Sequence, residues 1–188
     1  MRILPIVAAS LLAIATMTVA AGGENKIRAK LTGYQEVPSV STAASGSFVA
    51  EVAPDGQSFH YELSYGGLQG TVLQAHIHFG QKSVNGSIVI WLCGTTANPG
   101  PVGTQTCPQS GTITGDVFAT NVIATATSQQ IAAGEFAEVL AAMRAGVAYA
   151  NVHTSVSPGG EIRGQLRGHG MRKSDERDGS DDDADHRH

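Results

Sequence analysis

The amino-acid sequence predicts an all-β protein, an antiparallel β-sandwich or Greek-key barrel of about eight strands with one short helix. Between residues 26 and 166 the chain consists largely of short runs in which apolar and polar residues alternate, a pattern typical of half-buried strands. Turn-forming sequences such as Pro54-Asp55-Gly56 and Asn85-Gly86 separate these runs. Only residues 134–146 have helical periodicity. Many short strands with a single helix favour an antiparallel all-β architecture.

The strands are expected in chain order, each from its own pattern. Residues 26–31 alternate apolar with basic side chains and therefore form a half-buried strand. Residues 46–53 and 58–65 flank the Pro-Asp-Gly turn and form a hairpin, with the odd-numbered positions 59–65 facing the core. The full set of expected strands is 26–31, 46–53, 58–65, 73–79, 87–92, 112–119, 147–153 and 161–166.

The helix is expected from apolar residues at i, i+3, i+4 and i+7, namely Phe136, Val139, Leu140 and Met143. Arg144 near its end suits the helix dipole, and Gly146 is a suitable residue to follow the last turn. The acidic residues Glu135 and Glu138 fall on the opposite, exposed face. This segment therefore predicts one amphipathic helix packed against the sheet.

Both ends of the chain are expected to lie outside this domain. Residues 1–21 combine Arg2, an apolar run over 4–19 and small residues at 18–20, which indicates a cleaved signal peptide rather than a membrane anchor. We therefore expect a secreted or periplasmic protein with no membrane span after cleavage. Residues 168–188 are acidic and histidine-containing with almost no apolar side chains, so a disordered tail is expected there.

Cys93 and Cys107 are the two cysteines of the chain, and in an exported protein they are expected to form a disulfide. Such a bond would close a loop of about 15 residues and stabilise the fold by roughly 3 kcal/mol in the chain-entropy model. Two unpaired thiols are the alternative interpretation. The spacing does not suit a zinc site.

The charges are spread in a way that argues against nucleic acid as a partner. Residues 22–168 carry nine acids and seven bases, and residues 169–188 carry seven acids and four bases. Neither part shows the basic excess that phosphate backbones require. We expect an extracytoplasmic protein or a surface ligand as the partner instead.

The most distinctive chemistry lies in the strand Gln74-Ala75-His76-Ile77-His78. Alternation places Ala75 and Ile77 on an apolar face and Gln74, His76 and His78 on the other face. Two imidazoles at i and i+2 can bind one metal ion, and His153 on another strand would supply a third. Imidazole is a common ligand of copper and zinc, with Glu161 as a further ligand or a support for a histidine.

Structural roles for the same residues are the alternative. His76, His78, Asn151 and Thr154 would then hydrogen-bond loops across the sheet, and Glu161 would pair with Arg163 or Arg167. The sequence contains no Gly-x-Ser-x-Gly, and no glycine-rich phosphate loop opens a helix. We therefore expect no enzyme of an ordinary type.

Several motifs occur in an order that resembles the CHRD domain, which is repeated in the extracellular antagonist chordin and found singly in exported microbial proteins. They are Leu31-Thr32-Gly33, Glu36-Val37-Pro38, Asp55-Gly56, Ala75-His76-Ile77-His78, Asn85-Gly86, Leu140-Ala141-Ala142-Met143-Arg144-Ala145-Gly146, Tyr149-Ala150-Asn151-Val152-His153-Thr154 and Pro158-Gly159-Gly160-Glu161-Ile162-Arg163-Gly164-Gln165-Leu166. The resemblance covers residues 26–167, and the insertion between Cys93 and Cys107 is not part of the pattern. Asn151, Thr154, Gly160 and Arg163 belong to its last two motifs and are expected as further site residues.

The resemblance implies a binding or structural module, because the family has no established catalytic activity. The His-x-His pair followed by a late histidine also resembles the site of copper/zinc superoxide dismutase. That family has further metal histidines after the pair, whereas here the next one is His153. The leading expectation is an exported, non-enzymatic CHRD-domain protein, and the alternative is a β-sandwich domain that binds copper or zinc.

Overall fold

The computed structural model describes residues 25–168, in which it shows nine strands, one α-helix and two short 3-10 helices. The strands are β1 (Lys26–Thr32), β2 (Ser45–Val52), β3 (Ser58–Gly66), β4 (Val72–Phe79), β5 (Ser87–Cys93), β6 (Gly111–Phe118), β7 (Ala148–Thr154), β8 (Ile162–Gln165) and β9 (Arg167–Gly168). The helices are η1 (Gly33–Gln35), η2 (Ala119–Asn121) and α1 (Phe136–Arg144). The signal peptide expected at residues 1–21 lies outside the described residues, as does the tail from residue 169 onward.

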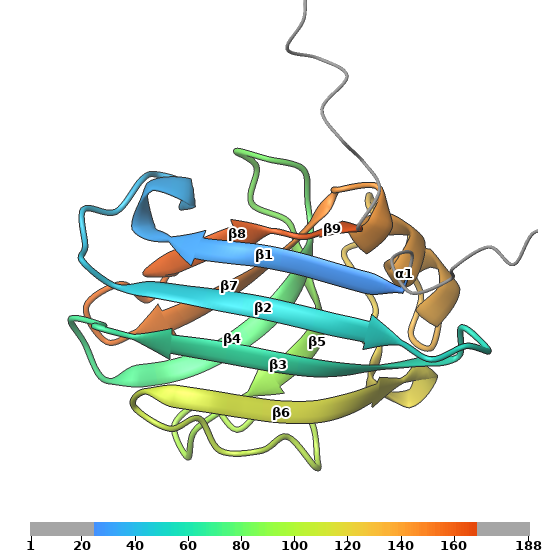
Figure 1. Ribbon diagram of the computed structural model, residues 1–188, viewed down its shortest axis with the longest axis horizontal. Coiled ribbons are helices and arrows are strands. Elements are labelled where there is room, and N and C mark those ends of the chain that lie inside the picture. The colour runs from blue at the N-terminus through green and yellow to red at the C-terminus, as the bar shows by residue number, and fades with distance from the viewer. Residues whose placement is uncertain (1–24, 169–188) are drawn as a thin grey trace, which may run out of the picture.

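The strands form one antiparallel sheet that curls until it is nearly closed. Its order is β5-β4-β7-β8-β1-β2-β3-β6, with β9 paired to β1. Figure 1 shows β1, β2, β3 and β6 as one layer, with β7, β4 and β5 behind it. The expected all-β fold class of about eight strands and one helix is therefore confirmed.

The core lies between these two layers, and the strand patterns explain which side chains enter it. In β1 and β3, buried and exposed residues alternate, as expected for strands that are covered on one face only. Phe59, Tyr61, Leu63 and Tyr65 of β3 all point inward, as their spacing predicts. In β7 and β8 every residue is buried, so these two strands are covered on both faces.

The α-helix begins and ends close to where its periodicity predicts. The four apolar residues that predict it, Phe136, Val139, Leu140 and Met143, are all buried. The ring of Phe136 lies 5.8 Å from that of Phe59 in β3, so the helix covers one end of the core. Gly146 has φ +74°, a conformation that favours glycine after a helix. Among the described residues, no helix is long and apolar enough to cross a membrane.

The loop between β5 and β6 bridges the two edges of the curled sheet. The expected disulfide between Cys93, the last residue of β5, and Cys107 ties this loop to one edge. Gln105 Nε2 donates to Thr114 O of β6, 3.0 Å away, at the other edge. The Tyr61 hydroxyl crosses the core to donate to Leu92 O at 2.8 Å. This loop therefore protects strand edges that would otherwise be free.

The C-terminal end of the sheet differs from the expectation. Of the run expected as one strand over 161–166, residues 162–165 form β8, Glu161 precedes it, and a separate short strand, β9, follows at 167–168. Gly168, expected as the first residue of the tail, pairs with Ile27 and belongs to the sheet. The short η1 and η2 were not expected, because three residues are too few to show a period.

Candidate metal centre

The predicted polar face of the histidine strand is real, and it is buried. In the register of the sheet, His76 of β4 lies opposite Asn151 of β7, and His78 lies opposite Tyr149. On the far side of β7, Asn151 lies opposite Arg163 of β8. Ala75 and Ile77 face the apolar core, as the alternation predicts. A second buried layer, made of polar and aromatic side chains, thus lies on the outer face of β4, β7 and β8.

Three imidazoles meet in this layer. His76, His78 and His153 each offer one nitrogen, and these nitrogens all lie within 4.8 Å of one another. His76 is fully buried, and the other two are nearly so. Nδ1 of His76 is 3.3 Å from Nε2 of His153. Two nitrogens bound to one tetrahedral zinc or copper ion lie about 3.4 Å apart, so this pair already has a suitable separation. We call these three residues the histidine cluster.

Backbone carbonyls orient two of the rings. Nδ1 of His78 is 2.9 Å from Gly86 O, and Nδ1 of His153 is 2.9 Å from Pro158 O. A carbonyl can only accept, so each Nδ1 carries the proton and each Nε2 keeps a lone pair. Asn151 Oδ1 lies 3.0 Å from Nε2 of His153. A ring nitrogen held by a carbonyl while the other faces inward is the usual arrangement of metal-bound histidine.

Two nitrogens of the cluster have no hydrogen-bond partner among the described residues. They are Nε2 of His76 and Nε2 of His78, both buried. A buried polar atom left unsatisfied costs about 1–3 kcal/mol. The cluster therefore has unused lone pairs in a place where the protein's own donors do not reach them.

The surroundings keep the cluster uncharged. Burial, followed by the neighbouring His153 and His78, lowers the pKa of His76 to about 2. Burial also lowers the pKa of His78 to about 4, against a hydrogen bond to Gly86 that raises it. The pKa of His153 is lowered by burial as well. Neutral imidazole is the form that binds metal ions.

Aromatic and cationic side chains form the walls of the site. Trp91 of β5 contacts His76 edge to face, with 4.2 Å between the ring centroids. Tyr149 stacks on His78 at 4.7 Å with the two planes nearly parallel. Arg163 covers the other side of Tyr149, 3.4 Å from its centroid, and donates to Val84 O at 2.9 Å. Arg163 thereby holds the loop whose Gly86 carbonyl orients His78.

Glu161 is buried but is not part of the histidine cluster. Its Oε1 accepts hydrogen bonds from Thr42 Oγ1 at 2.9 Å and from Gln69 N at 2.8 Å. Its Oε2 accepts from Thr154 Oγ1 at 2.7 Å. Burial acts to raise the pKa of Glu161, but these hydrogen bonds outweigh it and hold the pKa below its usual value. The expected pairing with Arg163 or Arg167 is not formed, and Glu161 instead joins three loops.

Glu36 is a site residue that the sequence did not single out, although it belongs to the Glu-Val-Pro motif. It is almost fully buried, and its Oε1 has no partner among the described residues. Burial raises its pKa to about 7, against the nearby Arg163 and hydrogen bonds from Val37 and Asn151. A Cβ added at Gly160 would overlap this carboxyl group, which explains the glycine there. A lone acid in a loop gives no pattern that could have revealed it.

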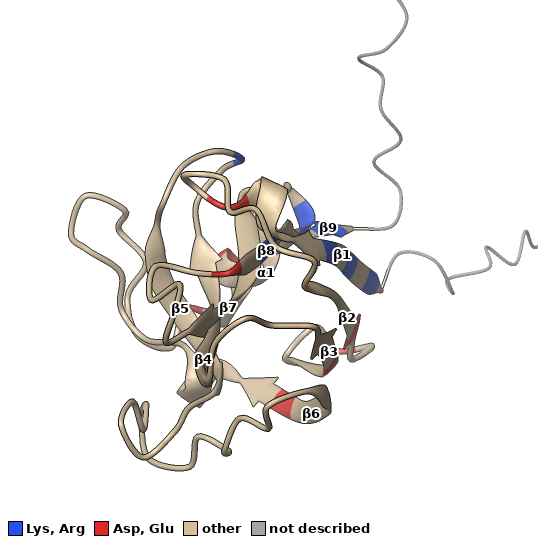
Figure 2. Cartoon of the chain, turned by 90° about the vertical axis from the view of Figure 1, so that its left-hand side faces the viewer, with Lys and Arg blue, Asp and Glu red and all other residues tan. Residues whose placement is uncertain are grey.

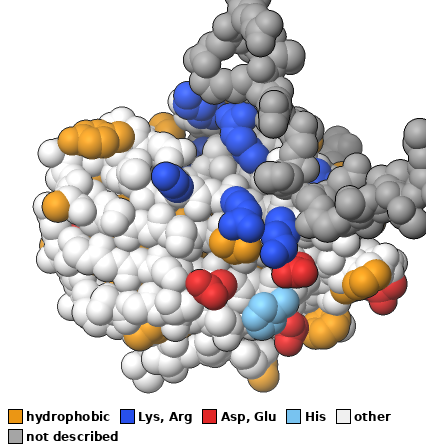
Figure 3. All heavy atoms as spheres, in the orientation of Figure 1, with side chains coloured by type: hydrophobic (Ala, Val, Ile, Leu, Met, Phe, Trp, Pro, Cys, Tyr) orange, Lys and Arg blue, Asp and Glu red, His pale blue; other side chains and the backbone are white. Residues whose placement is uncertain are grey.

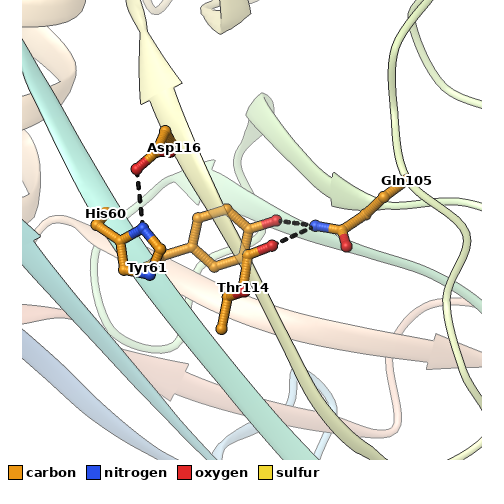
Figure 4. Close-up of polar contacts among 5 residues, drawn as sticks. All are labelled: His60, Tyr61, Gln105, Thr114 and Asp116. Atoms are coloured by element: carbon orange, nitrogen blue, oxygen red, sulfur yellow. Dashed lines mark hydrogen bonds and ion pairs between the residues drawn. The ribbon is translucent and has the colours of Figure 1, made fainter.

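The exposed His60 lies elsewhere, on the opposite layer. Its Nδ1 is 2.8 Å from Asp116 Oδ1, and both side chains are exposed. Figure 4 shows this pair beside Tyr61, whose hydroxyl accepts a hydrogen bond from Gln105 at 2.7 Å. His60 is therefore a surface strand residue, as its position predicts, and it offers a control for the buried histidines.

Comparison with known proteins identifies a family but no individual relative. The sequence model of the CHRD domain matches residues 27–166. Searches of curated proteins and of solved structures gave no match. The matched region contains the whole histidine cluster together with Glu36, Glu161 and the disulfide.

Proposed function

The chain belongs to the CHRD domain family, and on that premise we propose that it is an exported, non-enzymatic binding module whose ligand is one copper or zinc ion held by His76, His78 and His153. One observation carries this proposal: three neutral imidazoles converge in a buried layer, and two of their nitrogens have no partner among the described residues. A metal ion would take one nitrogen from each ring, including Nε2 of His78, which has no partner among the described residues.

The alternative in which these histidines only hold loops accounts for half of the geometry. It explains Nδ1 of His78 and Nδ1 of His153, which contact Gly86 O and Pro158 O. It does not explain why Nε2 of His76 and Nε2 of His78 are buried without a partner among the described residues. For a purely structural role, an amide or an apolar side chain would cost less than a buried imidazole without a partner.

Burial of the site supports a binding role rather than a catalytic one. His76 has no exposed surface, so an ion bound there would be held away from a substrate rather than presented to it. The Cys93–Cys107 disulfide fits an oxidising compartment outside the cytoplasm, and the apolar N-terminal run supports export.

The ligand set distinguishes the two candidate metals. Zinc in proteins takes four ligands, so it would need a donor beyond the three imidazoles. Asn151, whose side-chain oxygen lies 3.0 Å from His153 Nε2, is placed to supply it. Copper in its +1 state accepts three neutral nitrogens and brings less charge into a buried site near Arg163.

Trp91 provides a direct test, because it is the only tryptophan of the chain and contacts His76. Titration of the protein ending at Gly168 with Cu(I), Cu(II) or Zn²⁺ is expected to change its fluorescence up to one equivalent. Ending the chain there removes His186, His188 and the acidic run, which also attract cations.

The variant His78→Asn should abolish this change, whereas the matched control His60→Asn should leave it intact. If no metal saturates the fluorescence change near one equivalent, the cluster is structural. The same conclusion follows if both variants give the same titration curve.

A further inference from the structure

A basic groove lies on the outer face of β1 and β2 and borders Gln165 of β8 and Lys82 of the β4–β5 loop. It has a volume of about 490 Å³, and four basic side chains line it: Arg28, Lys30, Lys82 and Arg167. Uncharged residues complete its lining, among them Gln35, Ser47 and the nearly buried Gln165. Lys and Arg gather on this face in Figure 3, and Figure 2 shows them along β1 and β9. None of the described residues that line the groove is acidic.

The charges of this groove are not compensated among the described residues. The ion pairs of residues 25–168 are Lys26–Glu51 and His60–Asp116, and neither includes a basic side chain of the groove. Arg28 of β1 also lies directly opposite Arg167 of β9. Like charges facing each other across two strands are destabilising, and two guanidinium groups side by side suit carboxylates well. The groove therefore has the chemistry of a site for an anionic segment.

We propose that the occupant is the acidic C-terminal segment of the same chain, residues 169–188. This segment contains seven acids, and residues 181–185 contain four of them with no base. It follows Gly168 directly, and Gly168 follows Arg167, which lines the groove. The first of the four aspartates, Asp181, is 13 residues beyond Gly168. A chain of that length spans about 20 Å on average and roughly 45 Å when extended, so the run reaches every part of the groove.

Covalent attachment makes the segment the favoured occupant over an anion from solution. A tethered segment acts at an effective concentration in the millimolar range, which is enough for a contact made of a few charge pairs. These pairs are exposed, so salt screens them strongly. The docked segment would cover Arg28 and Arg167 and compete with any extracellular polyanion for the same groove.

NMR spectra of the backbone amides test the proposal. They compare the chain of residues 22–188 with the same chain ending at Gly168. EDTA in the buffer prevents a shared metal ion from linking the two parts. We expect shift differences at the groove, for example at Arg28, Ser47 and Val49, and their loss in 0.5 M NaCl. The variant in which Asp181, Asp182, Asp183 and Asp185 become Asn should give the spectrum of the shortened chain.

Two further comparisons make the result decisive. The double variant Lys30→Gln, Lys82→Gln should reduce the chemical-shift differences at the groove. Lys26→Gln should not reduce them, because Lys26 lies outside the groove and pairs with Glu51. The shortened chain should also bind dextran sulfate at least 3-fold more tightly than the full chain. Equal affinities, coincident spectra at the groove, or differences that persist in the four-Asn variant would overturn the proposal.

Discussion

At the histidine cluster, the ring nitrogens differ in their contacts. The Nδ1 atoms of His78 and His153 face the carbonyl groups of Gly86 and Pro158, which fixes the orientation of both rings. The Nε2 atoms of His76 and His78 remain without partners in the described part of the chain. Each such atom costs about 1–3 kcal/mol, and a metal ion that binds Nε2 of His78 would remove that cost at this atom.

The lowered pKa values of the cluster predict a loss of stability in acid when no metal is bound. At pH 5 the unfolded chain protonates His76, whose ordinary pKa is 6.5, while the folded protein with a pKa of about 2 does not. Protons then favour the unfolded state, so stability is complete above about pH 6.5 and falls as the pH decreases. His76 alone should contribute about 2 kcal/mol of this loss between pH 7.5 and pH 5. Urea denaturation of the wild-type protein and of His76→Phe, both in EDTA, measures this loss of stability.

Glu36 provides a control of opposite sign. Its folded pKa of about 7 lies above the ordinary 4.5, so it contributes stability in acid that is lost as the pH rises through 7. Glu36→Gln should therefore enlarge the loss in free energy of unfolding between pH 7.5 and pH 5 by about 2 kcal/mol. His76→Phe should reduce this loss by a similar amount. If His76→Phe leaves the difference unchanged, the folded protein protonates His76 and the cluster is not held neutral.

At the scale of elements, strand alternation was enough to predict half of the site. It placed His76 and His78 on one face and Ala75 and Ile77 on the other, and both assignments are confirmed. It could not show that β7 lies beside β4, because more than 70 residues separate Gln74 from His153 and such pairing follows from the whole topology. Tyr149 occurs at the alternating position of His153 and could have been noticed, since residues i and i+4 of a strand share a face.

The turn between β7 and β8 is a second element with a testable requirement. Gly160 has φ +127°, and a Cβ there would overlap the buried carboxyl group of Glu36. Gly160→Ala should therefore lower the free energy of unfolding by about 2 kcal/mol or more, from backbone strain and the clash together. At the neighbouring Gly159, a Cβ would have open space within 4 Å, and φ lies outside the left-handed range.

Gly159→Ala is thus the matched control and should change stability by less than about 0.5 kcal/mol. Chemical denaturation of both variants gives the comparison. Equal losses of stability would show that Glu36 does not pack against Gly160 as described.

The single curled sheet gives the molecule two kinds of outer face, one covered by loops and one open. The outer face of β4, β7 and β8 is covered by loops, which buries the histidine cluster, whereas the outer face of β1 and β2 remains open and carries the basic groove. The loop closed by the Cys93–Cys107 disulfide joins the two edges of the sheet. The fold class and the family followed from the sequence, but the burial of one polar face did not, because the covering loops have no periodic pattern.

The most direct test of the account is the metal content of the protein ending at Gly168, purified without chelating resins and measured by mass spectrometry. The account predicts close to one equivalent of copper or zinc per chain. That equivalent should be lost in His76→Ala, His78→Ala or His153→Ala and retained in His60→Ala, with circular dichroism confirming that each variant is folded. A folded wild-type protein that contains no metal and takes up none on addition of copper or zinc would contradict the account and leave the three histidines with structural roles only.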